Sequence, residues 1–274
     1  MTVNAALVHG RALLESSSIV LPEATAEVLL AHALHCEPSD LSARDSQELS
    51  ETEWSNYSRY LDERAGSKPT PYITHRQEFY GREFVVTADV LIPRRVSERV
   101  VEVALEVARD ARYILDVGTG SGALGITLQL ETGTDTWAAD VSHAAVAVAA
   151  ENARRLGATV HFAACDLTAA IGPSTMDLIV ANPPYVPLFH KDSMQREVCD
   201  WEPHIAIFGG ETGFELHDRL VADAPRVLRP GGWLVMEIGT GTWKHVSHLL
   251  RNWAGGRVVR DQSGNPRVIA VRRP

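Results

Sequence analysis

The sequence predicts an α/β protein, in which a mostly parallel sheet follows a small helical domain and a linking β-hairpin. Three observations support this prediction. The first 65 residues have helical periodicity, residues 78–92 alternate apolar and aromatic positions, and from Ala111 short apolar runs alternate with helical stretches. Alternating strands and helices are typical of a parallel sheet that is covered on both faces.

The N-terminal region is expected to form a helical domain over residues 1–75. Residues 24–34 place their apolar side chains on one face at helical spacing, and a second amphipathic stretch runs over residues 51–64. Gly66, Pro69 and Pro71 are expected to end the helical character. No residue type in this region indicates chemistry of its own.

Residues 76–95 are expected to form the linking β-hairpin, with its turn near Gly81. Residues 96–274 then carry the alternating pattern, so we expect them to form one catalytic domain. Its helices are predicted to include residues 144–156 and 213–228. Its buried strands are predicted at residues 113–117, 136–139, 160–164, 178–181 and 234–238.

Composition and charge exclude several classes of protein. Of the 274 residues, 45% are hydrophobic and 22% are charged, which is ordinary for a globular protein. The formal net charge of −9 argues against broad binding to nucleic acid, for which a basic face is expected. No apolar run is long enough to span a bilayer, so no membrane association is expected.

The cysteines point to a reducing compartment. Cys36, Cys165 and Cys199 are odd in number and widely spaced, which favours a cytoplasmic protein without disulfides. Cys36 follows His32 and His35, but no second pair of ligands stands at the spacing of a zinc site. We therefore expect no metal.

A glycine-rich loop follows the first strand of the larger domain. It consists of Gly118, Thr119, Gly120, Ser121 and Gly122, after a strand that ends in Asp116 and Val117. Glycines at a strand's carboxyl end let the backbone approach a ligand closely. Asp140 ends the next strand, where a carboxylate can accept hydrogen bonds from ribose hydroxyls.

The glycines alone leave two cofactors open, because residues 120–125 also fit the dinucleotide fingerprint of a nicotinamide enzyme. Two further acids favour S-adenosylmethionine. An acid in the position of Asp116 is typical of methyltransferases, where it lies near the methionine end of the cofactor. Asp166, with Leu167 beside it, follows the third strand, where adenine is contacted in such enzymes. Caps of helices would explain any one of these acids, but not all three at successive strand ends.

The fourth strand ends in Asn182, Pro183, Pro184 and Tyr185, the strongest signal in the chain. The Asn182 side-chain oxygen and the Pro183 carbonyl can each accept one N–H of a planar NH₂ group. Positive charge that grows on the nitrogen during methyl transfer is then stabilised. Tyr185 offers an aromatic face on which a planar group can stack. The motif therefore predicts N-methylation of an amide-like group.

These motifs, together with others along nearly the whole chain, resemble the HemK/PrmC family of peptide-chain release factor glutamine methyltransferases. The resemblance implies a Rossmann-like class I methyltransferase domain that uses S-adenosylmethionine. Besides the two loops, the matching segments are residues 26–34, 71–73, 78–81, 90–94, 202–203, 209–210, 230–232 and 264–268.

The resemblance also implies an acceptor and the residues that bind it. Members of the family methylate the side-chain amide of the glutamine in the Gly-Gly-Gln loop of release factors. It implies that the helical domain helps to recognise this protein substrate and that residues 182–185 hold the glutamine amide. Arg94 and Glu98 belong to the segment that lies near the substrate entrance in the family. Residues 201–204 are expected to form either a lid over the substrate or an ordered loop.

Two departures from the family pattern bear on the acceptor. The family continues Ile-Pro-Arg with Pro, an acid and Thr-Glu, whereas this chain has Arg95, Val96 and Ser97 before Glu98. His75 replaces a usual glycine. A small molecule with an amide or guanidine nitrogen is therefore an alternative acceptor, and adenine in nucleic acid is a less favoured one. A non-catalytic cofactor-binding protein is disfavoured by the intact Asn182–Tyr185 loop.

Overall fold

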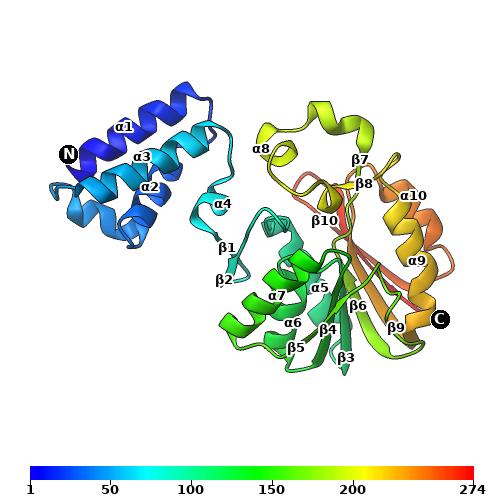
Figure 1. The fold of residues 1–274 in the computed structure, drawn as a ribbon. Coiled ribbons are helices and arrows are strands. Elements are labelled where there is room, and N and C mark those ends of the chain that lie inside the picture. Colours follow the sequence, from blue (N-terminus) through cyan, green and yellow to red (C-terminus); the bar gives the residue numbers. More distant parts are fainter. The chain divides into compact units, whose positions relative to one another are not determined.

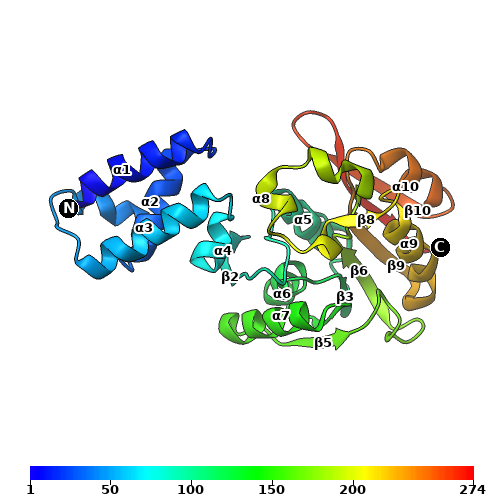
Figure 2. The ribbon, with the colours of Figure 1, turned by 45° about the horizontal axis from the view of Figure 1, so that its top comes forward.

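The computed structural model describes all 274 residues and divides into two units. Unit 1 comprises Met1–Arg76 together with Gln195–Trp201, and unit 2 comprises Gln77–Met194 and Glu202–Pro274. Figure 1 and Figure 2 show the N-terminal helices of unit 1 in blue and cyan, its segment Gln195–Trp201 in yellow, and the sheet of unit 2 in green to red. No helix in either unit is both long and apolar enough to cross a membrane.

Unit 1 is a small helical bundle, as the sequence predicts. Its helices α1, α2 and α3 pack against one another around a core that contains Leu14, Leu30 and Tyr57. The helix α3 begins at a capping box, in which Ser50 and Glu53 satisfy each other's backbone N–H groups. The elements are α1 (Val3–Ser16), α2 (Pro22–Ala33), η1 (Pro38–Arg44), α3 (Glu51–Ala65) and α4 (Thr70–Thr74).

The short helix α4 corrects the prediction that helical character ends before Pro71. Pro71 occupies the first turn of α4, where a backbone N–H has no partner within the helix in any case. A proline there is compatible with a new helix. His75, which ends α4, has a φ of 60° and is exposed. This left-handed conformation explains why a glycine suits the position.

A seven-residue segment of the second half of the chain belongs to unit 1. It contains the helix α8 (Arg196–Cys199), and the sequence analysis had assigned it to the catalytic domain. Glu197 accepts a hydrogen bond from the buried Arg64 guanidinium at 2.6 Å. The Lys68 ammonium lies over the Trp201 ring, 5.6 Å from its centroid. Arg64 and Glu197 are 133 residues apart in the chain, so no local sequence pattern predicts their pairing.

Unit 2 contains the predicted hairpin and a seven-stranded sheet. The hairpin consists of β1 (Arg76–Phe79) and β2 (Arg82–Val85), with Gly81 at its turn. The large sheet has the strand order β10-β11-β9-β6-β3-β4-β5. Its strands are β3 (Tyr113–Val117), β4 (Asp135–Asp140), β5 (Val160–Ala164), β6 (Met176–Ala181), β9 (Leu228–Glu237), β10 (Ala254–Arg260) and β11 (Pro266–Arg272).

Helices cover both faces of this sheet, as Figure 1 shows. Because side chains alternate along a strand, Leu178 packs with the helices α5 to α7, whereas its neighbour Ile179 packs with α9 and α10. The continuous apolar character of the inner strands follows from this double burial. The helices are α5 (Glu98–Val107), α6 (Ala123–Thr132), α7 (His143–Leu156), α9 (Glu215–Val227) and α10 (Trp243–Leu249).

The predicted α/β class is confirmed, and two strands are added to it. The five predicted strands run parallel to one another, while β10 and β11 pair antiparallel with their neighbours. The strand β10 was not foreseen because it lies at the sheet edge and is mostly exposed, so it lacks an apolar run. Short elements complete the unit: η2 (Arg95–Ser97), β7 (Val186–Pro187), η3 (Leu188–Ser193), η4 (His204–Ala206) and β8 (Phe208–Gly210).

Candidate active site

The register of the sheet brings the two sequence motifs together. Val117, the last residue of β3, pairs with Ala139 on one side and with Ala181 on the other. The glycine-rich loop therefore leaves the sheet between Asp140 and Asn182. The chain order reverses here, because β4 follows on one side of β3 and β6 lies on the other. Ligands of open α/β sheets bind at such a switch point, at the carboxyl ends of the strands.

A cavity of ≈ 360 Å³ lies at this switch point, and its walls come from unit 2. One side is formed by the glycine-rich loop and the ends of β4 and β5, and the other by the segment after the hairpin and the start of the Asn-Pro-Pro-Tyr loop. Of the sequence-predicted residues, the cavity is lined by Arg94, Gly118, Thr119, Gly120, Ser121, Asp140, Asp166, Leu167, Asn182 and Pro184.

The glycines of the loop have different roles. Gly118 and Gly120 have positive φ angles of 71° and 55°, and a Cβ built on either would meet nothing within 4 Å. Their backbone therefore borders open space, where a ligand can approach it. Gly122 is not part of the cavity wall. A Cβ there would lie 2.4 Å from the Ile126 Cδ1 atom, so this glycine permits close packing of α6 at its N-terminus.

Asp116 lies beneath the loop and is completely buried. Its Oδ2 atom accepts hydrogen bonds from the Thr119 hydroxyl at 2.6 Å and from the Gly125 N–H at 2.9 Å. Its Oδ1 atom has no partner. Burial raises the pKa of Asp116 to about 6, against the two hydrogen bonds that favour its charged form. A buried carboxylate oxygen without a partner beside the loop suits a cofactor that carries positive charge.

Asp140 and Asp166 line the cavity from the ends of successive strands. The Asp140 carboxylate accepts hydrogen bonds from the backbone N–H groups of Gly120 and Ser142, each at 2.9 Å. Each of its oxygens retains capacity for a second donor, as a ribose hydroxyl requires. Asp166 instead forms an ion pair with Arg219 of α9 at 2.5 Å. Arg219 also lines the cavity, and the sequence analysis missed it.

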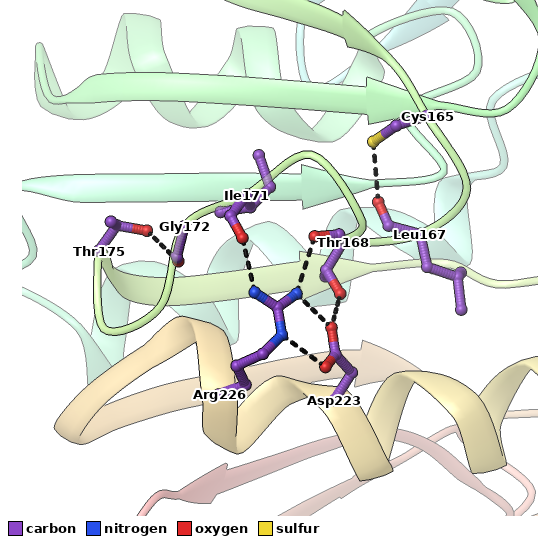
Figure 3. A network of polar contacts seen from close by, with 8 residues as sticks. All are labelled: Cys165, Leu167, Thr168, Ile171, Gly172, Thr175, Asp223 and Arg226. Atoms are coloured by element: carbon purple, nitrogen blue, oxygen red, sulfur yellow. Dashed lines mark hydrogen bonds and ion pairs between the residues drawn. The ribbon is translucent and has the colours of Figure 1, made fainter.

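Hydrogen bonds join the loop that carries Asp166 and Leu167 to α9, as Figure 3 shows. The Arg226 guanidinium donates to the backbone carbonyls of Ile171 at 2.7 Å and of Thr168 at 3.0 Å. Asp223 pairs with the same guanidinium and accepts a hydrogen bond from the Thr168 hydroxyl. This network holds a loop without regular structure at the edge of the cavity.

The Asn-Pro-Pro-Tyr loop presents the Asn182 amide to the cavity. The Asn182 Nδ2 atom donates to the Ser97 hydroxyl at 3.1 Å. The Tyr185 hydroxyl donates to the buried Glu237 carboxylate at 3.1 Å, and burial raises the pKa of Tyr185. Pro183 and Tyr185 are not among the residues that line the cavity. Neither Glu237 nor the role of Ser97 as a partner of Asn182 was predicted from the sequence.

Residues 94–98, which contain the departure from the family pattern, lie partly inside and partly outside the cavity wall. Arg94 lines the cavity, where its guanidinium pairs with the buried Glu202, and Glu202 also accepts from the Ile92 N–H at 3.2 Å. Glu98 lies outside the cavity wall, because its carboxylate accepts a hydrogen bond from the Tyr80 N–H at 3.0 Å. Arg95 is exposed and does not line the cavity either.

Comparison with known proteins matches the two parts of the chain to two families. Residues 5–74 match the PrmC N-terminal domain, and residues 98–199 match the methyltransferase small domain. A release factor glutamine methyltransferase of Koribacter versatilis is 42% identical over 265 residues, which cover 95% of each chain. One of Nitratidesulfovibrio vulgaris is 36% identical over 282 residues, which cover 99% of this chain and 95% of that one.

The chain belongs to the release factor glutamine methyltransferase family. Solved structures agree on the fold. A methyltransferase from Pyrococcus furiosus superposes with a TM-score of 0.54 at 16% identity, covering 80% of this chain and 98% of that one. The 16S rRNA N2 G1207 methyltransferase of Thermus thermophilus, solved with AdoMet and guanosine, has a TM-score of 0.54 at 16% identity. It covers 73% of this chain and 50% of that one.

As a member of this family, the chain is a methyltransferase that uses S-adenosylmethionine. The residues of the cavity fit that cofactor. The loop offers open space at Gly118 and Gly120, and the carboxylates of Asp116 and Asp140 lie beside it. No group of three His, Cys, Asp or Glu side chains in the 274 residues is placed to hold a metal ion.

Proposed function

We propose that this member of the family methylates the side-chain amide of the glutamine in the Gly-Gly-Gln loop of a peptide chain release factor. One observation carries the proposal. The pairing of Val117 with Ala181 places Asn182 directly beside Gly118, and both residues line the same cavity. A methyl donor on the glycine-rich loop and an amide on Asn182 would therefore meet.

The proposed chemistry requires alignment more than a strong base. The glutamine nitrogen is a weak nucleophile because its lone pair is delocalised into the carbonyl group. The Asn182 Oδ1 atom would accept one of its N–H groups in the cavity, and the carbonyl of Pro183, which follows Asn182 but does not line the cavity, would accept the other, so that the lone pair is directed toward the methyl donor. S-adenosylmethionine supplies that methyl group. Positive charge on the nitrogen is stabilised by both acceptors as the bond forms, and water then takes the acidic proton.

Features around the cavity favour a protein acceptor over a small molecule. Ile205 lines the cavity and is 59% exposed, while Leu188 and Phe189 of η3 are 41% and 73% exposed. The elements that carry them, η3 and η4, both contact β8. Exposed apolar side chains of this kind are typical of surfaces that bind other proteins. Arg95, a candidate for binding the carboxylate of a small acceptor, does not line the cavity.

The acceptor also defines the partners that we propose. Release factors act in translation, so we place the activity in the cytoplasm, in keeping with the three free cysteines. The net charge of −9 argues against a direct nucleic-acid substrate. We propose that the helical unit 1 contributes to recognition of the protein acceptor.

A direct competition tests the proposal. A folded release factor, a short Gly-Gly-Gln peptide, free glutamine and free arginine are incubated together with isotope-labelled S-adenosylmethionine and the full-length enzyme. We expect label on the loop glutamine of the folded protein and far less on the peptide, because remote contacts help to hold the amide in line. Label in a free amino acid alone would contradict the release-factor proposal and leave the methyltransferase chemistry intact. The Asn182→Ala protein serves as the control.

A further inference from the structure

We propose that Glu237 is a positioning residue, which acts through the Ser97 hydroxyl to set the orientation of the Asn182 amide and which also holds Tyr185. The proposal rests on the proposed function, because it assigns the Asn182 oxygen to the acceptor. It names residues that neither the motif nor its spacing contains. Glu237 does not line the cavity, so its action on the acceptor is indirect.

The hydrogen bonds form a chain whose direction is determined at one end. The Ser97 hydroxyl lies 2.6 Å from the Glu237 Oε2 atom and 3.1 Å from the Asn182 Nδ2 atom. An ionised carboxylate only accepts hydrogen bonds, so the single Ser97 hydrogen is given to Glu237. The Ser97 oxygen must then accept a hydrogen from Asn182. Only the NH₂ end of the Asn182 amide can supply it, which directs the amide oxygen away from Ser97.

The direction of these hydrogen bonds decides whether the Asn182 side chain can bind the amide of the methyl acceptor. An acceptor NH₂ group needs hydrogen-bond acceptors opposite it, and the Asn182 Oδ1 atom is one. If the Asn182 amide were rotated by 180°, its own NH₂ group would face that of the acceptor. Two donors would then oppose each other without an acceptor for either, and the acceptor amide would bind poorly.

Strand register explains how the three residues meet. Ala181 pairs with Met236, so Asn182 and Glu237 leave neighbouring strands side by side. Ser97 comes from η2, 140 residues away from Glu237 in the chain, and is 4% exposed. The charged and titratable groups around the Glu237 carboxylate are Tyr185, Arg94 and Arg267, and the His217 ring contacts the Glu237 backbone carbonyl at 3.2 Å.

The hydrogen bonds that join Glu237, Ser97 and Asn182, here called the relay, have a pH dependence with a definite sign. Burial raises the pKa of Glu237, against the hydrogen bonds from Ser97 and Tyr185 and the charges of Arg267 and Arg94. As the pH falls through this raised pKa, Glu237 gains a proton and becomes able to donate to Ser97. Ser97 can then donate to the Asn182 oxygen, which stabilises the rotated amide. Turnover should therefore fall on the acid side.

Substitutions of Ser97 and Glu237 test the relay in the full-length enzyme at saturating S-adenosylmethionine. We expect Ser97→Ala and Glu237→Gln each to lower kcat for a folded release factor on the order of 10–100-fold, because the amide is no longer held in one orientation. The Kd for S-adenosylmethionine, measured by calorimetry, should stay within about twofold, as removal of the relay leaves the loop hydrogen bonds in place. Ser97→Thr keeps the hydroxyl and should restore most of the activity.

The pH profile separates positioning from mere stability. The acid-side fall in kcat should be present in the wild type and in Ser97→Thr but absent from Ser97→Ala. Ser247→Ala is a matched control, because the Ser247 hydroxyl bonds only to the Lys244 carbonyl at the exposed surface of α10. It should behave as the wild type in every assay.

A spectroscopic measurement tests the relay in the enzyme without any acceptor. The side-chain NH₂ signal of Asn182, assigned by its loss in Asn182→Ala, should shift with the titration of Glu237 in the wild type and not in Ser97→Ala. Equal kcat for Ser97→Ala and wild type, or an Asn182 signal that titrates alike in both, would overturn the relay. A wild type that labels no release factor but shows the titration would instead overturn the proposed acceptor.

Discussion

The two halves of the cavity are built in different ways. The half that we assign to the cofactor consists of the backbone of one loop and of Asp140 and Asp166, at or just after the ends of β4 and β5, while Asp116 of β3 is buried beneath the loop. The half that we assign to the acceptor has Ser97 of η2 and Asn182 in the cavity wall, and Glu237 at the end of β9 is hydrogen-bonded to Ser97 from outside that wall. Cofactor binding therefore depends on local sequence and backbone, whereas acceptor binding depends on contacts between distant segments. Substitutions in the two halves should separate cofactor affinity from turnover.

The largest effect is expected from Asn182→Ala in the acceptor half. The substitution removes the amide oxygen that we assign to the acceptor but leaves Gly118 and Asp140 in place. We expect kcat to fall roughly 10²–10³-fold, as when one preorganised hydrogen-bonding group is lost. Calorimetry should give an unchanged Kd for S-adenosylmethionine. Full turnover in a correctly folded variant would rule out the proposed role of the motif.

Asp116→Asn tests the cofactor half through stability. The ordinary pKa of 3.8 rises to about 6 in the folded protein, so the folded state binds the proton more tightly. The free energy of unfolding of the wild type should therefore fall as the pH rises from about 4 to 6, by an amount on the order of 3 kcal/mol from this residue. Urea unfolding at several pH values should show that this fall is missing in Asp116→Asn. A parallel slope in both proteins would show that Asp116 is already ionised at low pH.

Asp140→Ala should weaken the cofactor and spare the chemistry. The Asp140 carboxylate accepts from the Gly120 N–H and has capacity for a ribose hydroxyl. Loss of hydrogen bonds to a charged group should raise the Kd for S-adenosylmethionine roughly 10–100-fold. The kcat at saturating cofactor should change little. If kcat fell as far as in Asn182→Ala, the two halves of the cavity would not be separable.

The smallest effect is expected from Arg226→Ala, which loosens the loop after β5. Arg226 bonds two carbonyls of this loop and pairs with Asp223, but its side chain is 39% exposed. We expect the free energy of unfolding to fall by about 1 kcal/mol. Arg154→Ala is the matched control, since Arg154 pairs only with Glu151 on the exposed surface of α7 and should leave the free energy of unfolding unchanged within measurement error. Urea unfolding distinguishes the two, and equal values would show that the carbonyl contacts contribute nothing.

The residues of the acceptor half include partners of Asn182 that were not predicted from the sequence. Glu237 stands inside an apolar run, and an acid within a buried strand was a signal that the sequence already carried. Ser97 carried a weaker signal, because it replaces the threonine of the family pattern and keeps a hydroxyl within a segment that otherwise differs. In the structure the Ser97 hydroxyl donates to Glu237 and accepts from Asn182. Glu98, which we expect near the substrate, accepts a hydrogen bond from the Tyr80 N–H of the hairpin.

The sequence by itself determined the α/β class, the five parallel strands β3, β4, β5, β6 and β9, the glycine-rich loop and the Asn182–Tyr185 motif. Each of these follows from burial or backbone conformation within a few consecutive residues, and such requirements leave a periodic or compositional trace. Only the tertiary structure decided that β10 and β11 complete the sheet, that Gln195–Trp201 joins unit 1, and that Ser97 lies between Asn182 and Glu237. Those contacts join residues far apart in the chain, and strand register together with packing sets them, neither of which a local pattern records.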